Sequence, residues 1–208
     1  MNFFGALLKS LSTKERFFLI GATIIFLITG LARVSLAINE NSEFVPIAGG
    51  TYIEGVVGQP SLINPIISNN PIDQDISALI YSRLSDLMNN YEIQENGRVY
   101  IIKLKEDLKW DDNLPLTSDD VIFTIKTIQD PESRSPLFKS WRGVVAERLS
   151  ELQIQIVLPA PYSFFPKNLE QILIIPKHIF GNIPAANLKL STYNLEPISS
   201  GPYRFQDF

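Results

Sequence analysis

Few residues in this sequence belong to the types that catalyse reactions or bind metals. The chain has one histidine, His178, and no cysteine, which excludes a thiol nucleophile, an iron–sulfur cluster and a cysteine-ligated zinc site. A zinc site would need carboxylates alone beside His178, and no GxSxG motif marks a serine that this histidine would activate. We therefore expect no enzymatic activity, no metal and no other cofactor, and we interpret His178 as a structural residue.

Two pairs of adjacent carboxylates are the remaining candidates for acid–base chemistry. Asp111 and Asp112 lie in a predicted turn, whereas Asp119 and Asp120 follow Thr117 at a predicted helix start. Carboxylates in such places usually accept hydrogen bonds from the nearby backbone. The sequence also has no EF-hand loop, P-loop or GxGxxG motif, so calcium and nucleotide sites have no support.

The two tryptophans are interpreted differently. Trp110 stands at the end of a predicted strand, and we expect it in the hydrophobic core. Trp141 falls between a predicted helix and a predicted hairpin, where an exposed aromatic ring can stack on a ligand. A structural role for Trp141 is the equal alternative.

Charge is distributed unevenly along the chain. The whole sequence has a net charge of -4, although basic residues predominate up to Ala37. The body that follows is therefore acidic, and it contains no stripe of lysine and arginine. Because nucleic-acid binding needs such a positive surface, we expect no nucleic-acid partner.

An apolar run, Phe17–Ala32, lies between Arg16 and Arg33. As a helix it would cover about 24 Å of the roughly 30 Å hydrocarbon core, and residues 34–38 can extend it. We expect residues 17–37 to form a signal-anchor transmembrane helix, with residues 1–16 as a cytoplasmic n-region. A signal peptide cleaved after Ala37 and a buried core helix are the alternatives. With either a signal-anchor or a cleaved signal peptide, the body is exported.

The body begins after a polar linker, residues 38–48, and its first half mixes strands and helices. Thr51–Val57 reads as a strand, Asp73–Met88 as an amphipathic helix, and Tyr91–Gln94 with Val99–Leu104 as a hairpin around Asn96-Gly97. Asp111–Asn113 predicts a tight turn.

The second half continues this mixed pattern. Thr117 is the expected N-cap, with Asp120 completing a capping box, of a helix that ends near Gln129. A second hairpin is predicted from Val144–Leu149 and Leu152–Leu158. Prolines are frequent after Pro159, so strands there must be short, and Ile172–Ile175 is the best candidate. The fold class is mixed α/β.

Several ordered motifs from about Gly49 to Phe208 resemble those of the extracellular solute-binding proteins, family 5, of oligopeptide, dipeptide and nickel ABC importers. The most specific is LKWDDNLPLTSDDV, which is similar to the family's VKWHDGxPLTAEDV, with Asp111 and Asn113 replacing histidine and glycine. The other similar segments are GGT (residues 49–51), LINP (62–65), GRVYIIKLK (97–105), IPKHI (175–179) and PISSGPYRF (197–205). In the last of these, Ser199 replaces a glycine.

This resemblance implies the first lobe of a periplasmic-binding-protein-like class II fold. Residues 49–208 would form its N-terminal part, with about 86–168 as an inserted β-hairpin-rich subdomain and the second lobe absent. The implied ligand is a peptide or small solute, and the implied partners are ABC permease subunits. Asn69, Asn70 and Pro71, in the loop along the family's cleft, and Trp141 are the expected ligand-binding residues. The alternative for Asn69, Asn70 and Pro71 is that they only form a turn. A membrane-anchored sensor or interaction module without a transport role is the alternative.

Overall fold

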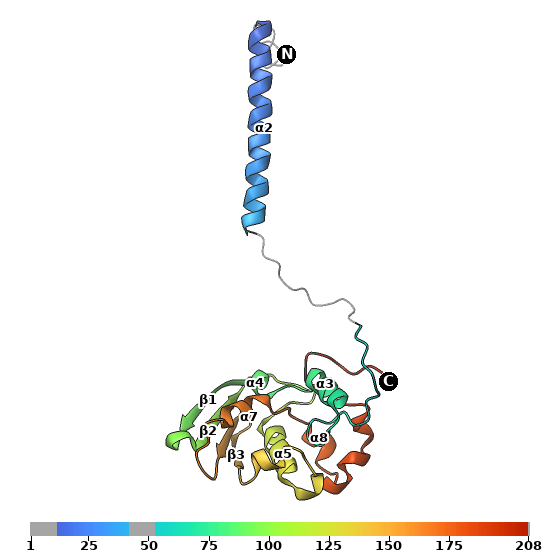
Figure 1. Ribbon diagram of the computed structural model, residues 1–208. Helices are drawn as coiled ribbons and strands as arrows, with labels where there is room; N and C mark the ends of the chain where they lie inside the picture. The colour runs from blue at the N-terminus through green and yellow to red at the C-terminus, as the bar shows by residue number, and fades with distance from the viewer. Residues whose placement is uncertain (1–11, 42–52, 208) are drawn as a thin grey trace. The chain divides into compact units, whose positions relative to one another are not determined.

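The computed structural model describes residues 12–41 and 53–207, which fall into two units divided after Glu54 (Figure 1). The first unit contains the long helix α2, Thr13–Asn41. Its start is capped reciprocally, because the Ser12 N–H donates to Glu15 Oε2 at 2.7 Å and the Glu15 N–H to Ser12 Oγ at 3.4 Å. Twenty-five residues, Thr13–Ala37, are long and apolar enough to cross a membrane.

Helix α2 extends beyond the predicted transmembrane segment. Residues 38–41 of the expected linker are helical, whereas residues 42–48 lie outside the described residues. The expected n-region is described only from residue 12 onwards.

A four-stranded antiparallel sheet forms the centre of the second unit. Its strands are β1 Met88–Gln94, β2 Val99–Leu104, β3 Val145–Ser150 and β4 Gln153–Val157, in the order β1-β2-β4-β3. Alternate residues face one side, and the cross-strand pairs Tyr100–Ile156 and Ile102–Ile154 are buried there. Strand β1 pairs with β2 and β3 pairs with β4, both antiparallel, so both predicted hairpins are confirmed.

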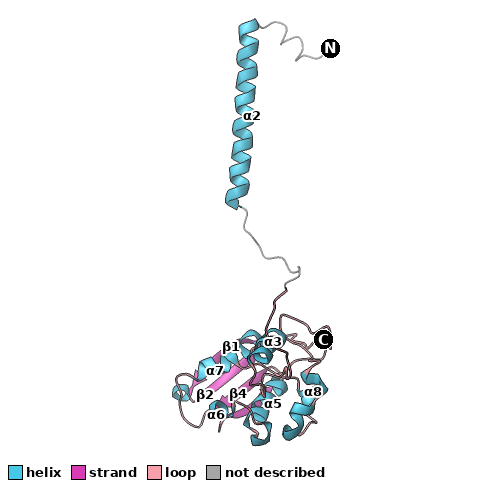
Figure 2. Ribbon diagram, turned by 45° about the vertical axis from the view of Figure 1, so that its right-hand side comes forward, coloured by secondary structure: helices cyan, strands magenta, loops and turns pink. Residues whose placement is uncertain are grey.

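Short helices lie beside this sheet (Figures 1 and 2). The ring of Phe165 in α7 contacts that of Tyr100 in β2 at 5.2 Å between centroids, and α5 packs against β3 and β4. The helices of this unit are α3 Pro71–Ile80, α4 Leu84–Leu87, α5 Ser118–Gln129, α6 Phe138–Trp141, α7 Phe165–Gln171 and α8 Lys177–Phe180. Short 3₁₀ turns occur at 95–97, 131–133, 185–190 and 192–194.

The predicted capping box of α5 is confirmed. The Asp119 N–H donates to Thr117 Oγ1 at 3.3 Å, and the Thr117 N–H donates to Asp120 Oδ2 at 2.9 Å. The other oxygen of Asp120 accepts from the Lys177 N–H at 2.9 Å. One buried carboxylate thus joins the start of α5 to the start of α8.

The single helix predicted over Asp73–Met88 is divided in the structure. Helix α3 ends at Ile80, and Tyr81 and Arg83 are extended before α4 begins. The backbone between the helices bonds elsewhere, because the Ile174 N–H donates to the Ser82 carbonyl at 3.1 Å and the Leu84 N–H to the Ile172 carbonyl at 2.9 Å. Tertiary hydrogen bonds here outweigh a helical sequence pattern.

Two predicted strands do not form. In the described part of Thr51–Val57 the backbone is not in a sheet, and Ile53 and Val57 are 88% and 100% exposed. Ile172–Ile175 is largely buried but forms only one bridge, between Leu173 and Arg83. Each segment lacks a continuous partner strand among the described residues, and a strand needs one to satisfy its backbone groups.

Candidate ligand-binding groove

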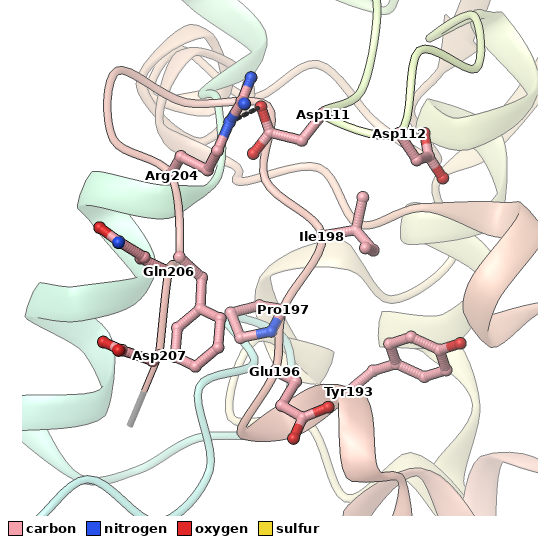
Figure 3. Close-up of a pocket in the computed structure, with 10 residues that line it drawn as sticks. Asp111, Asp112, Tyr193, Glu196, Pro197, Ile198, Arg204, Gln206 and Asp207 are labelled. Atoms are coloured by element: carbon pink, nitrogen blue, oxygen red, sulfur yellow. Dashed lines mark hydrogen bonds and ion pairs between the residues drawn. The ribbon is translucent and has the colours of Figure 1, made fainter.

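One cavity of about 570 Å³ lies beside the C-terminal segment (Figure 3). In it the guanidinium of Arg204 is turned toward Asp111, and its Nε donates to Asp111 Oδ1 at 2.9 Å. Asp112 is also engaged, since it accepts from the Leu114 N–H at 3.1 Å and lies 2.8 Å from His178 Nε2. The lining residues are Asp111, Asp112, Tyr193, Glu196, Pro197, Ile198, Arg204, Phe205, Gln206 and Asp207.

The charges of this cavity do not favour an anionic ligand. Its one lining cation, Arg204, is already paired with Asp111, which leaves Glu196 and Asp207 as lining carboxylates without an ion pair among the described residues. The carboxylates at the predicted turn therefore stabilise the chain itself, as the sequence pattern indicated.

A second cavity, called here the Trp141 groove, has a volume of about 330 Å³ and a different character. No acidic or basic side chain lines it. Its polar groups are amides and hydroxyls, and its apolar surface comes from proline, leucine, isoleucine and tryptophan. The lining residues are Pro65, Gln74, Ser77, Pro136, Leu137, Ser140, Trp141, Asn168, Gln171, Ile172 and Leu173.

Three helices provide the polar side chains of the groove. Gln74 and Ser77 lie three residues apart on α3, and Asn168 and Gln171 have the same spacing on α7. Residues spaced by three share one face of a helix, so each helix presents a pair of side chains to the groove. Ser140 of α6 lies beside them.

The floor of the groove is built on an aromatic contact. Trp141 is 2% exposed and packs edge-on against Phe165, with centroids 5.3 Å apart and an interplanar angle of 67°. Phe165 in turn contacts Tyr100 of the sheet. Because Trp141 is packed from behind in this way, α6 is fixed on the core that carries the sheet.

Two side-chain hydrogen-bond systems hold the loops around the groove. The amide of Gln129 donates to the carbonyls of Trp141 and Val144, both at 2.6 Å. The Ser135 hydroxyl donates to the Ile66 carbonyl at 2.6 Å and so ties together the loops that carry Pro136 and Pro65. The rim is therefore fixed by bonds that do not use the groove's own side chains.

Several polar groups of the groove are not hydrogen-bonded within the described part of the chain. The Ser77 hydroxyl is buried and has no hydrogen-bond partner among the described residues. Gln74 donates to the Ser68 carbonyl at 3.2 Å, whereas the Asn168 and Gln171 amides form no side-chain hydrogen bond within the described chain. Neutral donors and acceptors around an aromatic floor are suited to binding amide groups rather than to catalysis.

Comparison with known proteins places this fold. Residues 84–208, more than half of the chain, match the family model "Bacterial extracellular solute-binding proteins, family 5 Middle". The chain belongs to this family. This family 5 chain is 30% identical over 187 residues to the oligopeptide-binding protein AppA of Bacillus subtilis, covering 81% of the chain and 34% of that relative.

Solved structures agree with this assignment of the family 5 chain. It matches the ABC transporter substrate-binding protein CtaP of Listeria monocytogenes at 32% identity and a TM-score of 0.68, covering 74% of this chain and 33% of that one. It also matches B. subtilis AppA in complex with a nonapeptide at 28% identity and a TM-score of 0.68, with the same coverage. The chain spans about a third of the length of these relatives.

The four predicted site residues of this family 5 chain lie in two places, one in the groove and three at the start of α3. Trp141 lines the groove, although from a short helix and as a buried ring rather than as an exposed loop aromatic. Asn70 is the N-cap of α3, where its Oδ1 accepts from the Ile72 N–H at 3.1 Å, and Pro71 is the first residue of that helix. Asn69 is exposed just before it.

Sequence reasoning missed most of the polar lining of the groove in this family 5 chain. The signal that was present is the three-residue spacing of polar side chains, Gln74 with Ser77 and Asn168 with Gln171, on helices that otherwise contribute apolar residues to the core. Asn168 and Gln171 fall in a proline-rich stretch where the sequence does not predict a helix, so their spacing alone does not indicate a shared face.

Proposed function

We propose that this chain is the extracytoplasmic substrate-binding component of an ABC importer, which binds peptides or similar small solutes and delivers them to permease subunits. Membership of the solute-binding family supports the class of function. The observation that supports a peptide-like ligand is the groove itself, where neutral amides and hydroxyls surround Trp141. Such groups can pair with the N–H and C=O groups that every peptide offers.

The proposed ligand contacts combine prediction and structure. Trp141 would provide an apolar surface, with Ser77, Ser140, Asn168 and Gln171 as hydrogen-bonding groups. Asn69, Asn70 and Pro71 stay in the proposal as residues next to the ligand, because the helix that they begin carries Gln74 and Ser77 into the groove.

We further propose that residues 49–208 form the N-terminal part of a first lobe, with about 86–168 as its inserted subdomain. On this proposal the ligand site of the family is completed by a second lobe. A polypeptide of residues 1–208 alone should then bind peptides with a dissociation constant of about 1 mM, since it would lack roughly half of the contacts and the closing step of a two-lobed site.

Calorimetry of the full chain in detergent micelles with a pentapeptide library tests the proposed function. Weak binding that Gln171→Ala reduces is expected. The control is Gln155→Ala, which removes an amide of β4 outside the groove and should leave binding unchanged. Absence of peptide binding, or equal effects of the two substitutions, would contradict the proposal.

The proposed location of the chain rests on α2. We propose that α2 is a single-pass membrane anchor, with residues 1–16 in the cytoplasm and the binding unit outside. The length and apolar composition of Thr13–Ala37 support this proposal, as does the excess of basic residues before Phe17.

A further inference from the structure

A third cavity, called here the basic section, adjoins the Trp141 groove. It has a volume of about 370 Å³, and Ser140 and Asn168 line both cavities. Lys139, Arg142 and Tyr162 line the basic section only. The two cavities are therefore neighbours that meet at Ser140 and Asn168, and together they are called here the depression.

The charges of the two parts differ. The Trp141 groove contains no charged lining residue, whereas the basic section contains two cations and no carboxylate. Five ion pairs occur within residues 12–41 and 53–207, and neither Lys139 nor Arg142 takes part in any of them. Two unneutralised cations beside a cavity create a positive potential at one end of the depression.

The backbone on both sides of Arg142 is held in place. Arg142 follows directly after Trp141, whose carbonyl is bonded to Gln129, and Val144 is bonded to the same amide. Between them Gly143 has a φ of 76°, and a Cβ at this position would lie 3.5 Å from the Pro159 side chain. This glycine allows the chain to turn tightly at the edge of the basic section.

We propose that the basic section binds a carboxylate of the ligand, so that the site prefers peptides with a free C-terminal carboxylate or an acidic side chain. This inference rests on the proposed function. The ligand backbone lies in the Trp141 groove, and its carboxylate reaches past Ser140 to Lys139 and Arg142. A guanidinium can donate two parallel hydrogen bonds to a carboxylate, while the lysine ammonium adds a point charge.

Three pentapeptide libraries separate the sources of the carboxylate. The first has neutral side chains and an amidated C-terminus, the second has neutral side chains and a free C-terminus, and the third has an amidated C-terminus with aspartate and glutamate included. Calorimetry on the full chain in detergent micelles should show about tenfold tighter binding for at least one of the carboxylate-containing libraries than for the first. The library that gains affinity identifies the carboxylate.

Substitutions then locate the effect. The double variant Lys139→Gln with Arg142→Gln should remove the preference for carboxylate while the first library binds as before. Lys103→Gln is the matched control, because Lys103 is an exposed cation on β2 that lines neither cavity, and it should keep the preference.

The possible failures are distinguishable. Equal affinities for all three libraries, or a preference that survives the double substitution, would overturn the assignment of the basic section and leave the proposed function intact. No binding of any library would overturn both. Circular dichroism of the double variant identifies a loss of fold, and in that case the single variants Lys139→Gln and Arg142→Gln are compared with Lys103→Gln instead.

Discussion

Trp141 is a structural residue as well as a candidate ligand contact. Its ring is buried against Phe165, so truncation leaves a large cavity in the core. Trp141→Ala should lower the free energy of unfolding by about 3–5 kcal/mol, measured by urea denaturation. Trp141→Phe keeps an aromatic ring and should cost clearly less. A loss below about 1 kcal/mol for the alanine variant would show that the ring is not part of the core.

Asp120 should make stability depend on pH. Burial raises the pKa of its carboxyl, and the hydrogen bonds from the Thr117 and Lys177 N–H groups oppose this more weakly. The folded chain therefore binds the proton more tightly than the unfolded chain. The contribution of this group is fully present below its ordinary pKa of about 4 and is lost as the pH rises through the folded pKa.

The test of this pH dependence compares the native chain with Asp120→Asn. The variant loses one acceptor at every pH, but it no longer titrates at this position. Urea midpoints measured at a series of pH values should show that the advantage of the native chain over the variant is largest in acid and shrinks toward neutral pH. An advantage that grew with pH would have the wrong sign for a raised pKa.

At the scale of single residues, the sequence predicts backbone conformation where the residue type favours one. It does not predict close tertiary contacts. Asn113, in the predicted tight turn, has a φ of 68°, a left-handed conformation that asparagine tolerates. Gly201 is required for another reason, since a Cβ there would lie 2.7 Å from the Leu79 and Ile80 carbonyl oxygens. That contact joins residues about 120 positions apart, so no local pattern indicated it.

Among the elements, the segment from α6 to β3 depends on Gln129 of α5. Gln129→Ala removes both hydrogen bonds to the Trp141 and Val144 carbonyls and should cost about 1–3 kcal/mol. Amide hydrogen exchange should become faster across residues 141–145. Gln155→Ala removes an amide with no side-chain hydrogen bond among the described residues, and it should leave the exchange unchanged. Unchanged exchange in Gln129→Ala would show that other contacts hold this segment.

Elements were predictable where the local signal and the tertiary structure agree. The two hairpins and α5 have turn or cap residues at both ends, and they form where the sequence placed them. The helix over Asp73–Met88 was predicted too long, because the bonds that stop it at Ile80 come from residues 172–174 and 200–201. The Trp141 groove depends on α7, a helix in a proline-rich stretch, and so it could not be assembled from sequence alone.

At the scale of the whole chain, a single charged substitution in α2 tests whether this helix attaches the chain to a membrane. Ile24→Lys places an ammonium near the centre of the apolar segment, which costs about 2.5–3.5 kcal/mol in a membrane. The fraction of the chain that stays with membranes after alkaline washing should fall. Ile24→Val is the control and should behave like the native chain. Equal retention of both variants would contradict anchoring by this helix.

The open edges of the sheet have a consequence for crowding. Among the described residues, strands β1 and β3 each have one side without a partner strand, and both show an irregular register, at Met88/Asn90 and at Arg148/Ser150. Exposed Glu92 and Glu147 add charge to these edges. Tethering as proposed above would confine many copies to a plane, where strand-to-strand polymerisation becomes a hazard. Irregular, charged edges oppose such polymerisation, so a densely covered membrane can keep each copy separate.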